Sequence, residues 1–175
     1  GRVRPIPQLE AEIAEIWGES GARVRAALEG LPGLTLQPTA FRHRVSYDMD
    51  PETFDRPRAE AVVRELGHDP LVSADRFFDV LPRGVSKGPS LRRLIEFLKL
   101  EPRRVLAAGD TLNDLSMLAE DLPAVAVGGS EPALLSALPD RPTLHRARAL
   151  GAGGILEAVD VLGLHPAAPR PEIAA

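Results

Sequence analysis

The feature that most constrains this chain is an apolar run that ends abruptly in polar residues, at 105–114. Residues 105–108 are all apolar, a glycine follows, and then Asp110, Asn113 and Asp114 come within about one helical turn. This pattern predicts a buried parallel strand, a glycine turn and a helix whose first turn carries two carboxylates and an amide. Asp110 is then expected at the carboxyl end of the strand, where open α/β sheets bind ligands.

The oxygen atoms of this cluster indicate a site for a hard cation. We expect the side chains of Asp110, Asn113 and Asp114 to converge on one spot. Mg²⁺ is usually held by one or two carboxylates, with water and substrate phosphate as its other ligands. A purely structural alternative stays open, in which Asp110 or Thr111 caps the helix and Asp114 interacts favourably with the helix dipole.

Lys87 is the second candidate. The spacing of the apolar residues at 91, 94, 95 and 98 predicts a helix that begins next to this lysine. A cation is unfavourable at a helix N-terminus, so a phosphate and carboxylates nearby would explain its position. The alternative is a solvated surface lysine.

The predicted order of helices and strands changes near Pro82 and Gly84. The first eighty or so residues have the expected order helix, two strands, helix, two strands, which is typical of an α+β layer. From there strands and helices alternate strictly, which predicts right-handed crossovers and a parallel sheet. We therefore expect one domain at 1–82, a second at 83–165 and a flexible tail at 166–175.

The composition of the chain limits the classes of partner that it can bind. The 175 residues carry a formal charge of −4 with a pI near 5.6, which gives no footprint for nucleic acid or an anionic membrane. The sequence has no cysteine, and no apolar run approaches the roughly 18 residues of a membrane span. We expect a soluble cytoplasmic protein with no nucleic-acid or membrane partner. The oligomeric state stays open.

Lys87 followed by the string at 109–114 resembles the third and fourth motifs of the haloacid dehalogenase (HAD) phosphohydrolase superfamily. The stretches at 45–48, 78–88 and 151–158 are similar to the large-cap (type IIB), sucrose-phosphatase-like branch. The resemblance implies an α/β fold with a Rossmann-like parallel-sheet core. Residues 1–82 would be its α+β cap, which sets substrate specificity, and 83–165 the C-terminal part of the core.

The resemblance also implies an activity. Such proteins are Mg²⁺-dependent phosphatases, and this branch acts on a sugar phosphate or a glycosyl-polyol phosphate through an aspartyl-phosphate. By position Asp110 would be a metal ligand, and Asp114 a ligand directly or through water. Asn113 would be an orienting partner and Lys87 the cation that links nucleophile and phosphate.

One motif of that family is missing. Its nucleophile lies in Asp-x-Asp-Gly-Thr/Ser after an apolar strand, and Asp48-Met49-Asp50 is the only Asp-x-Asp in the sequence. Pro51 stands where the glycine should be, 42–44 is polar, and Lys87 follows too soon. The second-motif Ser or Thr is not identifiable either. We expect that both motifs lie upstream in a longer phosphatase, so that this chain alone is poorly active. The alternative is a non-catalytic HAD-like fragment or remnant that serves binding or assembly.

Overall fold

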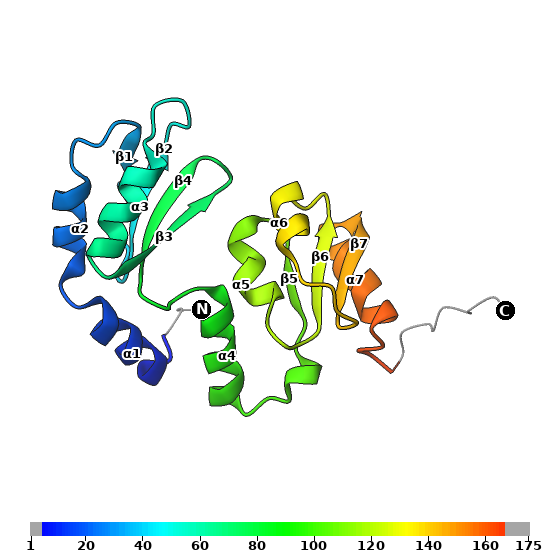
Figure 1. The fold of residues 1–175 in the computed structure, drawn as a ribbon. Coiled ribbons are helices and arrows are strands. Elements are labelled where there is room, and N and C mark those ends of the chain that lie inside the picture. The colour runs from blue at the N-terminus through cyan, green and yellow to red at the C-terminus, as the bar shows by residue number, and fades with distance from the viewer. Residues whose placement is uncertain (1–4, 167–175) are drawn as a thin grey trace. The chain divides into compact units, whose positions relative to one another are not determined.

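The chain folds into two compact units that divide after Ser86, each with its own sheet and hydrophobic core (Figure 1). The computed structural model describes residues 5–166, so the predicted tail at 166–175 lies outside the described residues except for its first position. Within 5–166 no helix has the length and apolar character that crossing a membrane requires.

The helices of the first unit begin and end at recognisable signals. The sequence predicts an amphipathic helix over 8–31 with Gly18 and Gly21 as candidate break points, and the structure has two helices there. The backbone at Gly18 turns to φ +50° and its N–H donates to the carbonyl oxygen of Ala14. The third helix begins where the Asp55 side chain accepts the N–H of Arg58 at 3.2 Å, a standard N-cap contact. These helices are α1 (Pro7–Trp17), α2 (Ser20–Leu28) and α3 (Arg56–Glu65).

The first unit has one antiparallel sheet of order β1-β2-β4-β3. Tyr47, Phe78 and Val80 alternate toward the core and are buried together with residues of α1, α2 and α3. The observed order of helices and strands confirms the predicted α+β arrangement, although the polar run at 42–44 lies outside the second strand. The strands are β1 (Leu34–Leu36), β2 (Val45–Met49), β3 (His68–Ser73) and β4 (Phe77–Pro82).

A buried histidine lies in this first unit. The ring of His68 contacts the ring of Trp17 with centroids 4.9 Å apart, and the residue is only 6% exposed. Burial lowers the pKa of His68, the charge of Arg23 lowers it further, and Asp69 opposes both. The folded state therefore favours the neutral imidazole.

The second unit is built on a parallel sheet of order β5-β6-β7, which confirms the predicted alternation (Figure 1). Ile95, Leu118 and Leu134 come from three different helices and are buried with the small residues of the strands. The α-helices and strands, in chain order, are α4 (Lys87–Leu98), β5 (Ala107–Gly109), α5 (Leu115–Leu118), β6 (Ala124–Gly128), α6 (Pro132–Ala137), β7 (Leu144–Leu150) and α7 (Gly151–Val161). Two 3₁₀ turns, η1 (Pro102–Arg104) and η2 (Leu112–Asp114), lie on either side of β5.

Arg141 closes the end of α5. Its Nη2 donates to the carbonyl oxygens of Leu118 at 2.7 Å and Leu122 at 3.1 Å, and its Nη1 donates to that of Glu120. Carbonyl groups in the last turn of a helix have no partner within the helix, so this guanidinium supplies the missing donors. The contact ties the segment before β7 to the chain between α5 and β6.

Replacing Arg141 with alanine should lower the free energy of unfolding by about 2–4 kcal/mol, because three carbonyl groups lose a charged donor. Urea unfolding followed by far-UV circular dichroism measures the change. Arg103→Ala is the matched control, since this exposed arginine pairs with the exposed Glu101 two positions away and its loss should leave stability unchanged. Equal effects of the two variants would contradict the structural role of Arg141.

The stability of the first unit should fall as the pH is lowered from about 7.5 to 5.5. The pKa of His68 is lower in the folded state, so below the ordinary histidine value of about 6.5 the unfolded chain binds a proton that the folded chain refuses. Fluorescence of Trp17, the single tryptophan, reports on this unit during urea unfolding. His68→Gln should flatten the pH dependence, and an unchanged profile in that variant would refute the assignment.

Candidate functional site

The predicted site lies at the carboxyl end of the parallel sheet, where β5 and β6 end. The chain leaves β5 at Gly109 and passes into η2 and then α5. The helix expected from Leu112 therefore begins as one 3₁₀ turn. A Cβ at Gly109 would lie 2.5 Å from the Cβ of Asp114, so only glycine fits at this turn.

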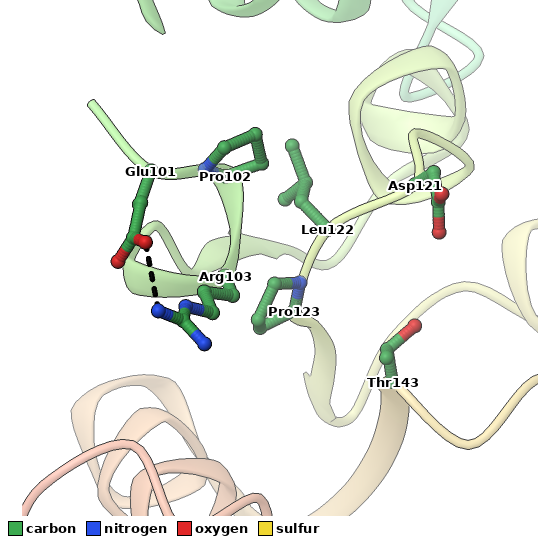
Figure 2. Close-up of a pocket in the computed structure, with 7 residues that line it drawn as sticks. All are labelled: Glu101, Pro102, Arg103, Asp121, Leu122, Pro123 and Thr143. Carbon is green, nitrogen blue, oxygen red and sulfur yellow. Dashed lines mark hydrogen bonds and ion pairs between the residues drawn. The ribbon is translucent and has the colours of Figure 1, made fainter. Parts of the chain in front are cut away.

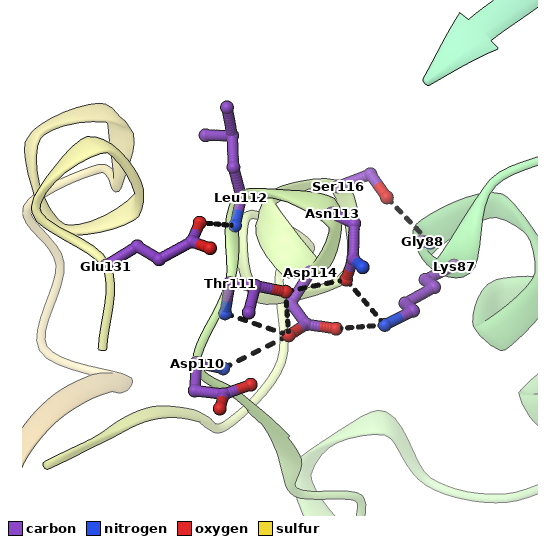
Figure 3. A network of polar contacts seen from close by, with 9 residues as sticks. All are labelled: Lys87, Gly88, Asp110, Thr111, Leu112, Asn113, Asp114, Ser116 and Glu131. Carbon is purple, nitrogen blue, oxygen red and sulfur yellow. Dashed lines mark hydrogen bonds and ion pairs between the residues drawn. The ribbon is translucent and has the colours of Figure 1, made fainter. Parts of the chain in front are cut away.

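Asp114 is the centre of the polar network shown in Figure 3. Its Oδ2 accepts the N–H groups of Asp110 at 3.1 Å and Thr111 at 3.2 Å, and its Oδ1 accepts from Lys87 Nζ. Burial by itself would raise the pKa of Asp114, but the hydrogen bonds from Lys87 and the two backbone groups outweigh it and lower the pKa below the ordinary value. The carboxylate is therefore ionised although the residue is only 5% exposed.

Lys87 is the first residue of α4 and reaches the same network. Besides Asp114 it donates to Oδ1 of Asn113 at 2.7 Å, while half of its side chain stays exposed. The predicted anionic neighbour of this lysine is thus the Asp114 carboxylate. Gly88 brings α4 this close, because its N–H donates to Ser116 Oγ at 3.1 Å and a Cβ there would lie 2.1 Å from the Ser116 carbonyl oxygen.

Asp110 behaves differently from the other two predicted oxygen ligands. Its carboxylate is exposed and, within the part of the chain that the structure describes, engages in no hydrogen bond or ion pair (Figure 3). Asn113 and Asp114 thus meet at Lys87, whereas the Asp110 carboxylate stays apart from that contact. Because the Asp110 carboxylate has no partner among the described residues, it is available to bind a ligand.

The donor set of this loop can be compared with the needs of Mg²⁺. Among residues 5–166 no three histidine or acidic side chains gather as a ready metal site. The Asp110 carboxylate is available as a direct ligand, while both Asp114 oxygens already have partners, so Asp114 suits contact through water. One carboxylate with water and phosphate matches the usual way in which Mg²⁺ binds.

The structure adds three residues that the sequence prediction did not assign to the site. Thr111 Oγ1 donates to Oδ1 of Asn113 at 3.0 Å, Ser116 receives the N–H of Gly88, and Glu131 Oε2 accepts the N–H of Leu112 at 2.7 Å. A threonine three residues before an aspartate is a readable capping signal. Glu131 carries no such signal, because it reaches the loop across neighbouring strands.

Asp48, the weighed alternative for the nucleophile, lies in the first unit. It sits on β2 of the antiparallel sheet and accepts from the side chain of Gln37 at 3.2 Å. This is a strand interior and not the carboxyl end of a parallel strand.

Two cavities lie apart from the predicted residues. One, of about 420 Å³, lies at the amino ends of the strands of the second unit, with mostly apolar walls and the Glu101–Arg103 ion pair at its side (Figure 2). The other, of about 320 Å³, lies in the first unit between Arg25, Phe41 and Arg44. Neither is lined by Lys87 or Asp110.

Comparisons with known proteins identify relatives of this chain. The chain is 43% identical over 157 residues to a glucosylglycerol-phosphate synthase of Pseudomonas anguilliseptica, covering 89% of this chain and 20% of that protein. It is 25% identical over 150 residues to a mannosylfructose-phosphate phosphatase of Agrobacterium fabrum, covering 82% of this chain and 60% of the relative. The chain therefore spans only part of the curated relatives that it matches.

A solved structure shares the fold of both units. The sucrose-phosphatase of Synechocystis sp., solved with sucrose and phosphate, superposes with a TM-score of 0.78 at 25% identity, covering 87% of this chain and 65% of that one. The family model described as sucrose-6F-phosphate phosphohydrolase matches residues 3–163. Because this model matches almost the whole chain, the chain belongs to the sucrose-phosphatase-like family of the HAD superfamily.

Proposed function

We propose that this chain is the cap and the C-terminal part of the core of an HAD phosphatase that hydrolyses a sugar phosphate or a glycosyl-polyol phosphate. Residues 1–82 would be the cap and 83–165 the core part. One observation carries the proposal: Lys87 meets Asn113 and Asp114 at the carboxyl end of β5, beside an Asp110 carboxylate that has no partner among residues 5–166. Family membership gives the reaction class.

Lys87 would supply positive charge to the phosphoryl group. Its ammonium is already oriented by Asn113 and Asp114, and half of the side chain remains exposed to meet a ligand. A cation that is fixed before the substrate arrives needs little reorganisation as charge develops on the phosphoryl oxygens. Asn113 and Asp114 therefore act through the lysine and the loop.

Asp110 would hold Mg²⁺ directly, and Asp114 would contact it through water. When bound, the ion neutralises charge on the phosphoryl oxygens. The Asp110 carboxylate suits this role because no neighbour among residues 5–166 competes for it. The backbone of the same residue is held by Asp114, so the carboxylate projects from an ordered loop.

The nucleophile would come from outside this sequence. Formation of an aspartyl-phosphate needs a carboxylate next to Lys87 and Asp110, and the only Asp-x-Asp of the chain lies on an antiparallel strand of the other unit. The missing first motif also supports a second candidate function, a non-catalytic remnant kept for binding or assembly. Turnover by a longer polypeptide separates the two.

The names of the relatives support the substrate class. One is a glucosylglycerol-phosphate synthase, another a mannosylfructose-phosphate phosphatase, and the solved sucrose-phosphatase holds sucrose and phosphate. All three names combine a glycosyl group, a second hydroxyl-rich unit and phosphate. We infer that the substrate of the whole protein has the same three parts.

Mg²⁺ binding tests the role of Asp110. Isothermal titration of this chain with Mg²⁺ should show weak binding, and Asp110→Asn should weaken it by more than about tenfold because the direct ligand loses its charge. Asp140→Asn is the matched control, since the side chain of this aspartate is fully exposed and its 3.5 Å contact is with Arg146, away from the loop at 110–114. Equal affinities of wild type and Asp110→Asn would refute the assignment.

Phosphatase assays test the rest of the proposal. With p-nitrophenyl phosphate and Mg²⁺ this chain alone should show little or no turnover, and Asp48→Asn should change nothing. In a longer polypeptide with an upstream Asp-x-Asp motif, turnover should appear and Lys87→Met should lower kcat by about 10²–10³.

The matched control in that longer polypeptide is Lys99→Met, an exposed lysine just beyond α4 that should leave kcat unchanged. Robust turnover by the short chain that Asp48→Asn abolishes would contradict our cap assignment. An inactive longer polypeptide would favour the remnant.

A further inference from the structure

The loop between β5 and η2 has three successive N–H groups that all point to carboxylates. Those of Asp110 and Thr111 donate to Asp114, and that of Leu112 donates to Oε2 of Glu131 at 2.7 Å (Figure 3). Hydrogen bonds to a charged acceptor at this distance are short and about twice as strong as neutral ones. The backbone of the loop is thus fixed by two carboxylates from different parts of the chain.

Glu131 holds this loop twice. It follows β6, the strand next to β5, and its own N–H donates to the carbonyl oxygen of Asp110 at 2.9 Å. Its side chain accepts from Leu112, two positions further on. The two bonds therefore hold the backbone on both sides of Thr111, and one of them is made to the backbone of Asp110, whose carboxylate we assign to the metal.

The alternative structural role for Glu131 would be to cap the N-terminus of α6. Glu131 is the N-cap residue of α6, yet its side chain makes no cap hydrogen bond there. Its carboxylate binds the neighbouring loop instead. The Glu131 carboxylate therefore stabilises the segment at 110–112 and not the start of α6.

Three carboxylates near this loop then have separate tasks. Asp114 and Glu131 bind backbone N–H groups, and the Asp110 carboxylate is left without a partner among the described residues. Residues that hydrogen-bond to a metal ligand and fix its orientation strongly affect the affinity for the metal, and mutating them typically weakens it by about 10–100-fold. We propose that Glu131 is a positioning residue that fixes the Asp110–Leu112 backbone and thereby presents the Asp110 carboxylate to the cation; the cation part rests on the proposed function.

Two readouts test Glu131 in this chain. Amide hydrogen exchange at Leu112 should be about tenfold faster in Glu131→Ala, because its acceptor is gone. In Mg²⁺ titration the same variant should bind about 10–100-fold more weakly than wild type. Glu131→Gln keeps an oxygen acceptor, so it should restore most of the protection and bring the affinity to within about threefold of wild type.

Glu101→Ala is the matched control for charge. It removes an exposed glutamate of the same unit that pairs with Arg103 and is not in contact with the loop at 110–112, and both readouts should stay at the wild-type value. Unfolding curves of all variants show whether a general loss of stability explains the result. Unchanged Leu112 exchange in Glu131→Ala would overturn the inference. Equal weakening by alanine and glutamine would also overturn it, because charge and not the hydrogen bond would then matter.

Failure of the proposed function gives a different outcome. If wild type binds no Mg²⁺, the metal role of Asp110 fails, and Leu112 exchange alone decides whether Glu131 holds the loop. If wild type binds Mg²⁺ and Glu131→Ala binds it equally well, the metal site stands and the positioning role of Glu131 fails.

Discussion

The second unit depends on one buried carboxylate. An ionised side chain that is 5% exposed is costly unless its charge is matched, and Asp114 is matched by two loop N–H groups and the Lys87 ammonium. These three partners come from two pieces of structure, the loop after β5 and the start of α4. Asp114 thereby fixes where both of them lie.

The backbone around the Asp114 carboxylate is tightly packed. Gly109 and Gly88 stand where any Cβ would collide, the first with Asp114 and the second with the backbone of Ser116. Further along α4, Arg92 forms a two-pronged pair with Glu120 that continues the same contact. The start of α4 is thus held against η2 and α5 at several successive points, which orients Lys87 without any help from a ligand.

Local periodicity predicted the alternating strands and helices of the second unit. The resemblance in motif spacing predicted that Lys87 and the string at 109–114 belong to one site, although 26 positions separate Lys87 from Asn113. The division of work between Asp110 and Asp114 was not predictable, because it depends on which oxygen takes which backbone N–H. Glu131 was missed for a related reason: its contact requires β5 and β6 to be side by side, which no local pattern states. The two glycines at 18 and 21 marked candidate breaks in the first amphipathic pattern, and the positive φ of Gly18 shows which of them ends the first helix.

The different roles of the Asp110 and Asp114 carboxylates have a consequence for how the two positions change during evolution. A lineage that lost phosphatase chemistry would still need Gly109 and Asp114, because removing either would disturb the packing and the hydrogen bonds of the loop. Among residues 5–166 Asp110 is bonded through its backbone alone, so folding by itself would not retain its carboxyl group. In a set of relatives, an aspartate at 110 is therefore a better marker of surviving chemistry than the aspartate at 114, although both belong to the same motif.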